Sequence, residues 1–530
     1  MIEAAGGKAA PIRILVEMRS LGGLRYFKST VEALVARGHR VTLLVEDPSK
    51  HGATEQAWVD HMLTHPNFTF ETRPRYRKDR WHRRGIRLRA ALEYLHYLAP
   101  EYEALPRYAK KALRRSPPAV VRKMTALPLV GSALGRVAAY RALSAIERAL
   151  PLPAAPQADL RRLAPDLLVM ADVGSRFSQR ASFVRTAVAE GIPTVIAVAS
   201  WDNLTTRPPL RVLPHAVTVW NEGQREEAVR VHGFPAERVR VLGAPNFDQW
   251  FTWRPRPREL FLERVGLDPA KPVILWVGSA INQWELPEPA FFERWLAAVR
   301  AADDPALATA GVLVRPHPLR QVDWEAMSLA TIEGVAVWPR RNVAMPIDAE
   351  QSSDYFDSIY HSAAVVGINT SAMIEASIVG RPILSVVEPA YFDSQHGAIH
   401  FNHLLEQGRG ALRLAPTMEE HLIDLARHLG GVDSETAEAL GSFVERFVRP
   451  RGLDQPVTPL VVSTLESIAA GVLQPEPDPW TVVVLRAALR GVFFPAAAVA
   501  AARRMQRTGR RRLRAYAAAA YRSLRRLPPP

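Results

Sequence analysis

Short apolar runs alternate with amphipathic, helix-like stretches along most of the chain. In the first half such runs recur between helical or loop patterns, at residues 11–16, 40–45, 166–170, 194–198, 216–220 and 238–242. Short uninterrupted apolar runs are typical of strands buried on both faces, and such strands form parallel sheets covered by helices. The pattern therefore predicts a Rossmann-like N-terminal half that opens with a strand, a glycine-containing loop over residues 19–25 and a helix over residues 26–37.

The same alternation restarts after a segment rich in proline and arginine. Residues 253–271 begin with that segment and are typical of an interdomain linker. Beyond it, buried strands are predicted at residues 272–277, 311–315, 335–339, 363–368 and 383–387. Helices are predicted over residues 418–446 and 461–470, with an irregular stretch at 450–459. The sequence thus predicts an α/β fold in which two Rossmann-like domains, residues 1–252 and 272–473, face each other across a cleft.

Two segments depart from this alternation, and both are strongly basic. Residues 73–150 have a tyrosine-containing helical pattern and predict an insertion in the N-terminal domain. Residues 474–530 begin with a proline-spaced linker and continue as an arginine-rich amphipathic tail, with a helix predicted over residues 500–527. Residues 73–123 hold 16 Lys or Arg and four acids, and residues 481–530 hold 12 Arg and no acid. Each of these two stretches carries +12, so the rest of a chain with net charge +15 carries −9.

Composition narrows the classes of protein to which the chain can belong. Its 530 residues are 48% hydrophobic and 23% charged, as in ordinary folded proteins. It has no cysteine, which excludes disulfides, thiolate catalysis and cysteine-bound zinc and fits a reducing compartment. The sequence shows no uncharged apolar stretch long enough to span a membrane and no long apolar region of a signal peptide. We therefore expect a cytoplasmic protein without a membrane-spanning helix.

The most informative stretch is residues 367–383, GINTSAMIEASIVGRPI. Its polar trio Asn369, Thr370 and Ser371 follows a predicted strand and opens a helix. The first N–H groups of a helix have no partner within the helix, and together with the positive end of the helix dipole they bind phosphate. Glu375 lies about one turn further, where a carboxylate can accept hydrogen bonds from ribose hydroxyls. The stretch predicts a nucleotide-diphosphate site; an N-capped βαβ unit with a surface glutamate is the alternative interpretation.

Polar side chains also follow other predicted strands of the second half. Ligands of doubly wound sheets lie beyond the C-terminal ends of the strands. Arg315 and His317, in the run VRPHP, place a fixed cation and a titratable donor there, so we expect them beside the diphosphate. A rigid loop with a solvated arginine is the alternative. Ser279, which follows the strand at residues 272–277, is a weaker candidate because a serine at such a position is usually a helix cap.

These motifs together resemble a family. The GT-B fold glycosyltransferases, most of all the CDP-glycerol glycerophosphotransferase-like and surface-carbohydrate branch, have motifs similar to VILWVGS (273–279), VRPHP (314–318), GINTSAMIEASIVGRPI (367–383) and FVRPRGLDQP (447–456). The resemblance covers roughly residues 160–460. It implies a metal-independent enzyme whose C-terminal domain binds a nucleotide-activated donor as substrate, with no cofactor, because a helix dipole and basic side chains stabilise the leaving diphosphate.

The resemblance also assigns roles to individual residues. It implies that Thr370 and Ser371 hold the donor phosphates with His317 beside them, and that Glu375 holds the ribose. Where the related polymerases have Asp-Tyr-Ser-Ser, this chain has Ile-Asn-Thr-Ser, so the transferred group is either a sugar or glycerol phosphate. In such enzymes an acidic or amide residue after the last strand often faces the donor group, and the candidates are Asp393, Gln395 and His396.

The acceptor is expected at the strand ends of the N-terminal domain. An inverting transferase needs a base within hydrogen-bond reach of the acceptor hydroxyl. Asp202, in the run SWDNLT, is our candidate for that base, with Glu17 and Asp172 as competitors. The alternatives are a turn or cap for Asp202 and a buried ion pair with an arginine for Glu17. The histidines at positions 396, 400 and 403 have helical spacing, and we expect them to line the cleft or to be structural rather than to bind a metal.

The sequence therefore predicts a transferase of the GT-B type that acts in the assembly of cell-surface polysaccharide. It would move a sugar or polyol-phosphate from a nucleotide-sugar or CDP-polyol donor to a saccharide or lipid-linked acceptor. The tail at residues 481–530 is expected to lie on an anionic membrane at its inner face, while nucleic-acid binding and a solvated tail are the other interpretations. The alternatives for the whole chain are a non-hydrolysing sugar-nucleotide epimerase of the same fold and a catalytically silent scaffold whose tail binds membrane or nucleic acid.

Overall fold

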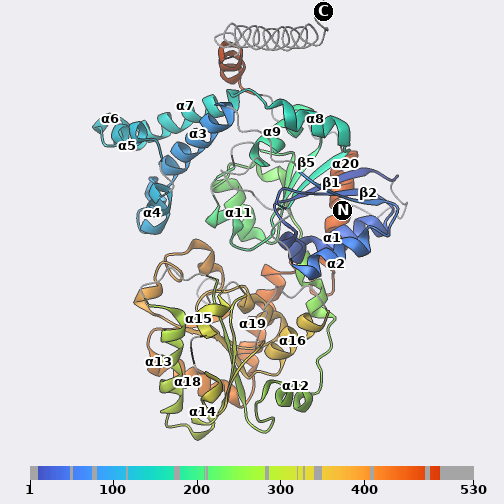
Figure 1. Cartoon of the computed structure of the whole chain (residues 1–530). Helices are drawn as coiled ribbons and strands as arrows, with labels where there is room; N and C mark the ends of the chain where they lie inside the picture. The colour runs from blue at the N-terminus through green and yellow to red at the C-terminus, as the bar shows by residue number, and fades with distance from the viewer. Residues whose placement is uncertain are drawn as a thin grey trace, which may run out of the picture.

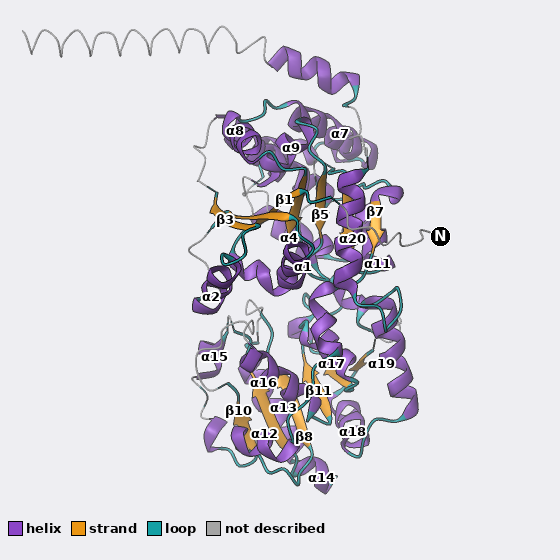
Figure 2. Ribbon diagram, turned by 90° about the vertical axis from the view of Figure 1, so that its right-hand side faces the viewer, coloured by secondary structure: helices purple, strands orange, loops and turns teal. Residues whose placement is uncertain are grey.

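Two parallel sheets organise the chain in its computed structural model, and each belongs to its own domain (Figure 1). The structure describes residues 10–47, 52–73, 80–114, 117–171, 180–207, 209–210, 213–280, 286–318, 320–325, 327, 329–339, 349–405, 411–471 and 478–489. A second view shows helices on both sides of each sheet and the two domains stacked one above the other (Figure 2). The expected fold class, α/β with two Rossmann-like domains, is confirmed by this strand arrangement.

The N-terminal sheet has seven parallel strands in the order β3-β2-β1-β4-β5-β6-β7. In β1, Ile14 and Val16 face one hydrophobic core and Leu15 faces the other, so both faces of the sheet are buried. Burial on both faces is the reason why the central strands of this sheet are largely apolar. The strands are β1 (Arg13–Met18), β2 (Arg40–Val45), β3 (Phe68–Thr72), β4 (Leu167–Ala171), β5 (Thr194–Ala197), β6 (Ala216–Val219) and β7 (Val239–Val241). The helices are α1 (Leu24–Ala36), α2 (Ala53–Met62), α8 (Ala154–Leu163), α9 (Arg180–Ala189), α10 (Asn203–Thr206) and α11 (Glu222–Arg230).

The C-terminal sheet has six parallel strands in the order β10-β9-β8-β11-β12-β13. Its two faces also carry separate cores, with Leu275 of β8 in one and its neighbour Trp276 in the other. The strands are β8 (Val273–Val277), β9 (Gly311–Arg315), β10 (Val335–Val337), β11 (Ala364–Gly367), β12 (Ile383–Val386) and β13 (Leu412–Ala415). The helices are α12 (Arg258–Val265), α13 (Glu288–Arg300), α14 (Pro305–Ala308), α15 (Gln321–Glu325), α16 (Ala349–Tyr360), α17 (Ala372–Val379), α18 (Met418–Leu429) and α19 (Ser434–Phe447).

Each sheet contains one point at which the strand order reverses. In the N-terminal sheet it lies between β1 and β4, and in the C-terminal sheet it lies between β8 and β11. A crevice opens at such a switch point because the helices on either side leave in opposite directions. The two edge strands β3 and β13 are absent from the sequence prediction, since polar and partly exposed positions interrupt the apolar run in each.

The insertion in the N-terminal domain is a helical arm (Figure 1). Its two longest helices pack along each other, and the short helices α5 and α6 form its outer end. Residues 480–489 form one further helix at the root of the arm, where Asp478 pairs with Arg148 at 3.0 Å. The helices of the arm are α3 (Arg80–His96), α4 (Pro106–Arg114), α5 (Ala119–Thr125), α6 (Pro128–Gly131) and α7 (Ala133–Ala149).

The chain crosses between the domains twice, and the second crossing returns it to the N-terminal domain. Asp248, beside the first crossing, accepts from the backbone N of Val457 at 2.9 Å and of Thr458 at 2.7 Å, and it pairs with Arg449 at 2.9 Å. These bonds cap α20 (Val457–Ala470), which packs against the core of the N-terminal sheet. The motif FVRPRGLDQP is therefore the returning crossing, and α20 leaves the C-terminal domain with which the sequence had grouped it.

The predicted linker and tail differ in how much of them the structure describes. Within residues 253–271, helix α12 buries Phe261 and Leu262 in a core shared with the C-terminal sheet, so much of the expected linker is part of that domain. Residues 490–530, including the helix expected at 500–527, lie outside the described residues. None of the helices in the described parts of the chain is both long and apolar enough to span a bilayer.

Candidate functional site

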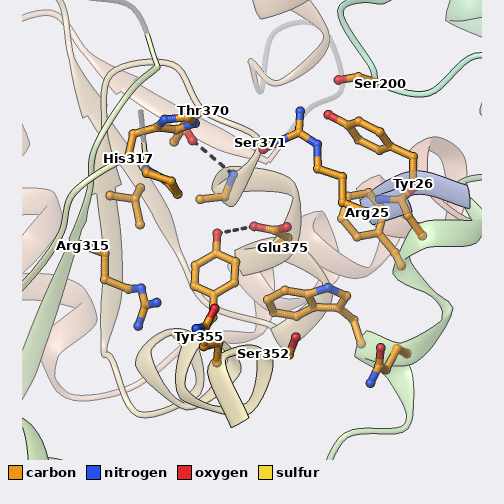
Figure 3. Close-up of a pocket in the computed structure, with 18 of the residues that line it drawn as sticks. Arg25, Tyr26, Ser200, Arg315, His317, Ser352, Tyr355, Thr370, Ser371 and Glu375 are labelled. Carbon is orange, nitrogen blue, oxygen red and sulfur yellow. Dashed lines mark hydrogen bonds between the residues drawn. The ribbon is translucent and has the colours of Figure 1, made fainter. Parts of the chain in front are cut away.

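A cavity of about 540 Å³ lies between the two domains, at the C-terminal ends of β8 and β11. These strands flank the switch point of the C-terminal sheet, where ligands of doubly wound sheets bind. The N-terminal domain contributes the start of α1 and the short helix η4 (Pro245–Phe251) to the opposite wall. Figure 3 shows side chains from both domains converging on this space. The predicted interdomain cleft is therefore present.

The turn from β11 into α17 faces this cavity. Thr370 and Ser371 line it, and Ser371 is the N-cap residue of α17 without making a capping hydrogen bond through its side chain. The Thr370 hydroxyl instead accepts from the backbone N of Ala372 at 3.4 Å. Asn369 is buried, and its amide donates to the carbonyl of Ser394 at 2.6 Å, which fixes the turn. The helix N-terminus is thus held open toward the cavity, as the sequence predicts for a phosphate site.

Backbones approach each other closely where β8 and β9 end. The backbone N of Gly278 donates to the carbonyl of Arg315 at 2.9 Å, and a Cβ on Gly278 would lie 2.8 Å from the backbone N of His317. Only glycine fits there, so the turn VRPHP packs directly against the end of β8. Burial, with Arg25 and Arg320 nearby, lowers the pKa of His317 to about 4. His317 is therefore a neutral imidazole at the cavity wall at physiological pH, able to donate one hydrogen bond.

Glu375 belongs to a cluster with Tyr355 and Arg315. The hydroxyl of Tyr355, on α16, donates to the Glu375 carboxylate (Figure 3). The Arg315 guanidinium lies 4.9 Å from the centre of the Tyr355 ring and donates to the Ser358 hydroxyl at 2.7 Å. In Figure 3 the Arg315 side chain points away from Thr370, and its contact is with the ring of Tyr355. This orientation differs from the one the sequence predicts, in which Arg315 would contact the diphosphate itself.

The carboxyl group of Glu375 titrates close to neutral pH. Burial raises its pKa to about 7, although the hydrogen bond from Tyr355 and the charges of Arg25 and Arg315 act to lower it. Burial and the neighbouring carboxylate raise the pKa of Tyr355 well above its usual value, so Tyr355 remains the donor. The second carboxylate oxygen of Glu375 makes no hydrogen bond within the described part of the chain. One oxygen is thus held in place while the other is left for a ligand.

Arg25 and Tyr26, at the start of α1, are site residues that sequence reasoning missed. Figure 3 shows Arg25 extending from the N-terminal domain toward Ser371, and its charge acts on the pKa of both Glu375 and His317. The Arg25 guanidinium also lies 4.4 Å from the centre of the Tyr26 ring. The signal was in the sequence: both residues follow the first strand and its glycine loop, which is the position where strand-end ligands are expected.

Aromatic side chains form the wall of the cavity opposite Thr370. The rings of Trp250 and Trp253 have centroids 5.0 Å apart, and Trp250 lies 5.5 Å from Tyr355. The Trp338 indole also lines the cavity and donates to Asp354 at 3.1 Å. Flat apolar faces of this kind suit an aromatic base. Trp250 and Tyr355 are far apart in the sequence, so only the fold brings their side chains together.

A second cavity of about 390 Å³ adjoins the first and shares Arg25, His317, Thr370 and Ser371 with it. Asp202 lines only this second cavity. The remaining walls come from the ends of β1 and β4 and from the turn after β5, so this space belongs mainly to the N-terminal domain. The two cavities thus lie next to each other, one at the C-terminal switch point and the other at the N-terminal strand ends.

Asp202 faces a histidine of the other domain. Burial opposes ionisation of its carboxyl group, but His400, Ser200 and Arg207 outweigh it and lower the pKa of Asp202. Burial lowers the pKa of His400 to about 4, and its ring packs 4.8 Å from that of Trp201. Asp202 is therefore ionised and His400 neutral at physiological pH. Asp202 has the charge state that a proton acceptor needs, and its catalytic role stays a prediction.

The insertion packs against both sides of this second cavity. Lys111 donates to the carbonyl of Thr206 at 3.0 Å, one turn after Asp202. Tyr108 accepts from the backbone N of Ile399 at 3.3 Å, next to His400. The arm therefore borders the second cavity.

Two further candidates line neither cavity. Gln395 is buried, and its amide donates to the carbonyl of Val386 at 3.0 Å, so it holds the loop that follows β12. Ser279 is also buried and donates through its backbone N to Glu288 at 2.9 Å, and it faces a separate cavity beyond β8. Ser279 lies between Gly278 and Ala280, which line the two cavities, and a sequence pattern cannot tell which of adjacent residues points inward.

Of the other two candidate bases, Glu17 has a structural role. It is fully buried and bonds to Arg180 at 2.6 Å, and Arg73 lies 3.4 Å from its other oxygen. It lines neither cavity, so the buried ion pair, and not the catalytic base, is the interpretation that its position supports. Asp172 lies outside the described residues.

The three spaced histidines do not share one face. His396 is exposed, His400 packs against Trp201, and His403 bonds to Glu227 at 2.7 Å. Within the described residues, no three His, Cys, Asp or Glu side chains are grouped closely enough to hold a metal ion.

Comparison with known proteins gives structural likeness only. No family model matches the chain, and no curated protein matches it. A UDP-GlcNAc 2-epimerase from Methanocaldococcus jannaschii has 11% identity and a TM-score of 0.48, over 86% of this chain and all of that one. A glycosyltransferase from Rickettsia africae ESF-5 has 9% identity and a TM-score of 0.47, over 86% of this chain and 98% of that one. The wall teichoic acid polymerase TagF has 11% identity and a TM-score of 0.41, over 87% of this chain and 90% of that one. At these values the likeness says nothing of activity, and the fold assignment depends on the strand order.

Proposed function

We propose that this chain is a transferase of the GT-B type, which moves a sugar or polyol-phosphate from a nucleotide-activated donor to a hydroxyl of a saccharide or lipid-linked acceptor. The observation that carries the proposal is the pair of adjoining cavities between two Rossmann-like domains. One cavity has the groups that recognise a nucleotide diphosphate, and the other has a carboxylate that can accept a proton. A donor and an acceptor thus each have a place, as transfer requires.

The donor is assigned to the first cavity. The N-terminus of α17, with Thr370 and Ser371, receives the diphosphate, and Arg25 adds a cation from the opposite domain. Glu375, held by Tyr355, accepts from the ribose hydroxyls, and the tryptophan wall receives the base. The N-terminus of α17 and Arg25 stabilise the negative charge that develops on the nucleoside diphosphate when it departs as the leaving group.

The acceptor is assigned to the second cavity. Asp202 takes the proton of the attacking hydroxyl, and the neutral His400 leaves its negative charge undiminished. His317 lies at the boundary of both cavities, so it can donate a hydrogen bond to the donor phosphate while the acceptor approaches.

Donor binding is tested first, in a thermal-shift screen against UDP-, GDP-, CDP- and dTDP-linked donors. A ligand that binds the folded state raises the midpoint of unfolding. For the donor that binds, we expect Glu375→Ala to weaken the affinity measured by calorimetry several-fold, and Glu445→Ala, an exposed glutamate of α19, to leave it unchanged. An unaltered affinity in Glu375→Ala would refute the ribose assignment.

Transfer is then distinguished from epimerisation. The protein is incubated with the bound sugar nucleotide alone, and the products are followed by NMR. A transferase leaves the sugar nucleotide largely intact until an acceptor is added, whereas an epimerase converts it without one. Conversion without acceptor would replace the proposal with the epimerase alternative.

A further inference from the structure

We infer that the outer end of the insertion arm is a docking surface for an anionic lipid membrane. This arm tip comprises residues 119–137, that is α5, α6, the turn after them and the start of α7. It extends away from the body of the N-terminal domain in Figure 1. The inference concerns a surface distinct from the two cavities, so it does not depend on the proposed activity.

The arm tip exposes large aliphatic side chains that nothing in the described chain covers. Neither α5 nor α6 has a single buried residue, although both are largely apolar. Folded proteins seldom leave so many large apolar side chains together on one surface unless the surface binds something. The exposed side chains are Val120 (61% exposed), Met124 (43%), Leu127 (56%), Leu129 (82%), Leu134 (85%) and Val137 (49%).

The local geometry presents these side chains on a fixed turn. Ser132 caps α7 by accepting from the backbone N of Gly135 at 3.0 Å, and its hydroxyl donates to the carbonyl of Leu129 at 2.8 Å. A Cβ on Gly135 would lie 2.0 Å from that same carbonyl, so glycine allows α7 to pack against the preceding turn. Leu129 and Leu134 therefore project outward on either side of a capped helix start.

The charge of the segment matches an anionic surface. Residues 104–146 hold nine Lys or Arg and no Asp or Glu. Arg122 and Lys123 are exposed on α5, beside Val120 and Met124, and Arg141 is exposed on α7. Aliphatic side chains interleaved with cations are typical of helices that lie in the interface of an anionic bilayer. Each cation near such a surface contributes about 1 kcal/mol to binding.

The kind of apolar side chain distinguishes lipid from nucleic acid. Proteins that bind single-stranded nucleic acid add aromatic rings on which bases stack, and the exposed apolar side chains of the arm tip are all aliphatic. The exposed leucines also stand on a projecting end and line none of the cavities, whereas a docking groove for a peptide helix is concave. A bilayer is the partner that accepts projecting aliphatic groups among cations.

Docking through the arm tip would also orient the second cavity. Lys111 and Tyr108, further along the same arm, contact the two segments that carry Asp202 and His400. If the proposed function holds, an acceptor held in the membrane by a lipid reaches this cavity along the arm.

The test uses the full chain and exploits its lack of cysteine. A single cysteine is introduced as Leu129→Cys and labelled with nitrobenzoxadiazole, whose emission rises and shifts to the blue when it enters lipid. The matched control is Leu260→Cys, on α12 of the other domain, where the leucine is 61% exposed. On vesicles of 30% phosphatidylglycerol in phosphatidylcholine, we expect emission to rise several-fold at position 129 and to stay constant at position 260.

The label distinguishes the arm tip from the tail. If the tail alone attaches the protein, it floats with the vesicles while emission at position 129 stays unchanged, and the inference is overturned. A blue shift that grows with protein concentration in the absence of vesicles, or one caused equally by a single-stranded RNA, would overturn it as well. Loss of sugar-nucleotide binding has no bearing on this result, so the two proposals fail separately.

Two variants test the apolar and the charged contributions. In flotation, we expect the pair Arg122→Ser and Lys123→Ser to weaken binding to the anionic vesicles about 30-fold, the equivalent of two cations near the surface. The pair Leu129→Asn and Leu134→Asn should weaken it at least tenfold, whereas Leu260→Asn and Ile423→Asn, at comparably exposed positions elsewhere, should not. Undiminished flotation of both arm variants would refute the inference.

Discussion

The two switch points of this protein have the same strand order, but the side chains at their strand ends differ. At the C-terminal one, Gly278 and Gly367 end β8 and β11, and a Cβ on either would lie within 3.0 Å of neighbouring backbone. The first cavity lies next to these strand ends, and polar groups at the start of α17 line it. At the N-terminal one, Glu17 near the end of β1 is fully buried and pairs with Arg180, and Arg73 lies 3.4 Å from its other oxygen.

The comparison shows that the strand order determines where a crevice lies, while the side chains at the strand ends determine whether it can bind a ligand. The crevice at a switch point gives a ligand a place, and the side chains at the strand ends determine what that place can bind. In the N-terminal domain a buried ion pair joins β1 to α9 and to the segment after β3. The next residues along the chain, Met18 at the end of β1 and Arg19 after it, line the second cavity together with Asp202.

The largest expected effect concerns the buried ion pair of Glu17. Glu17→Ala removes the carboxylate from beside two buried guanidinium groups, so we expect the free energy of unfolding of the N-terminal domain to fall by about 3–5 kcal/mol, although Arg73 keeps its pair with Glu46. Urea denaturation followed by circular dichroism measures the change. Glu17→Gln, which keeps the shape, should fold and should retain most of the transfer rate. A large loss of turnover in a stably folded Glu17→Gln would show that Glu17 takes part in catalysis.

The next effect concerns the base on the N-terminal side. Asp202→Asn keeps the hydrogen bonds with Thr206 and Asn203 but removes the proton acceptor, so we expect kcat to fall by about 100-fold or more. Donor affinity, measured by calorimetry, should not change, because Asp202 lines only the second cavity. If kcat fell less than tenfold, the base would have to be sought elsewhere in the cleft.

The third prediction uses the titration of Glu375. Its pKa in the folded protein is about 7, so the carboxyl is mostly protonated at pH 6 and mostly ionised at pH 8. The ionised form accepts more hydrogen bonds from ribose, and we expect affinity for a sugar nucleotide to rise about tenfold from pH 6 to pH 8. In Glu375→Gln this dependence should disappear. A pH dependence that survives in Glu375→Gln would belong to another group.

The smallest expected effect is that of a chelator. The start of α17 and Arg25 both line the first cavity, and in the proposed function they balance the charge of the diphosphate without a metal ion. We therefore expect EDTA to change the transfer rate less than twofold. A loss of activity that magnesium or manganese restores would contradict a metal-independent site.

The sequence predicted those features that local chemistry imposes. The apolar runs within β1 and β8 are strands because burial on both faces favours apolar side chains at successive positions, with the ion-paired Glu17 as the exception in β1. The trio at 369–371 marked a helix start, since such a start needs small polar side chains, and that start faces the cavity. The edge strand β13 was missed because exposed Arg413 interrupts its apolar pattern.

The sequence could not predict which side chains meet across the cleft. Arg315 was expected at the diphosphate, yet Ser358 and the ring of Tyr355, more than 39 residues away, hold its guanidinium on the other side of Glu375. Arg25 reaches the same site from α1 in the other domain. Such contacts depend on rotamers and on domain packing, which no local pattern contains.

By itself, the sequence determined two parallel α/β domains, a basic helical insertion and a helix start after residues 369–371, because each follows from periodicity or composition within a short window. Only the tertiary structure decided that Glu17 is a buried ion pair, that Tyr355 and Arg25 belong to the site, and that Asp202 faces His400. The physical reason is that burial and partnership set the charge state and direction of a polar side chain. Both depend on residues that are distant in sequence.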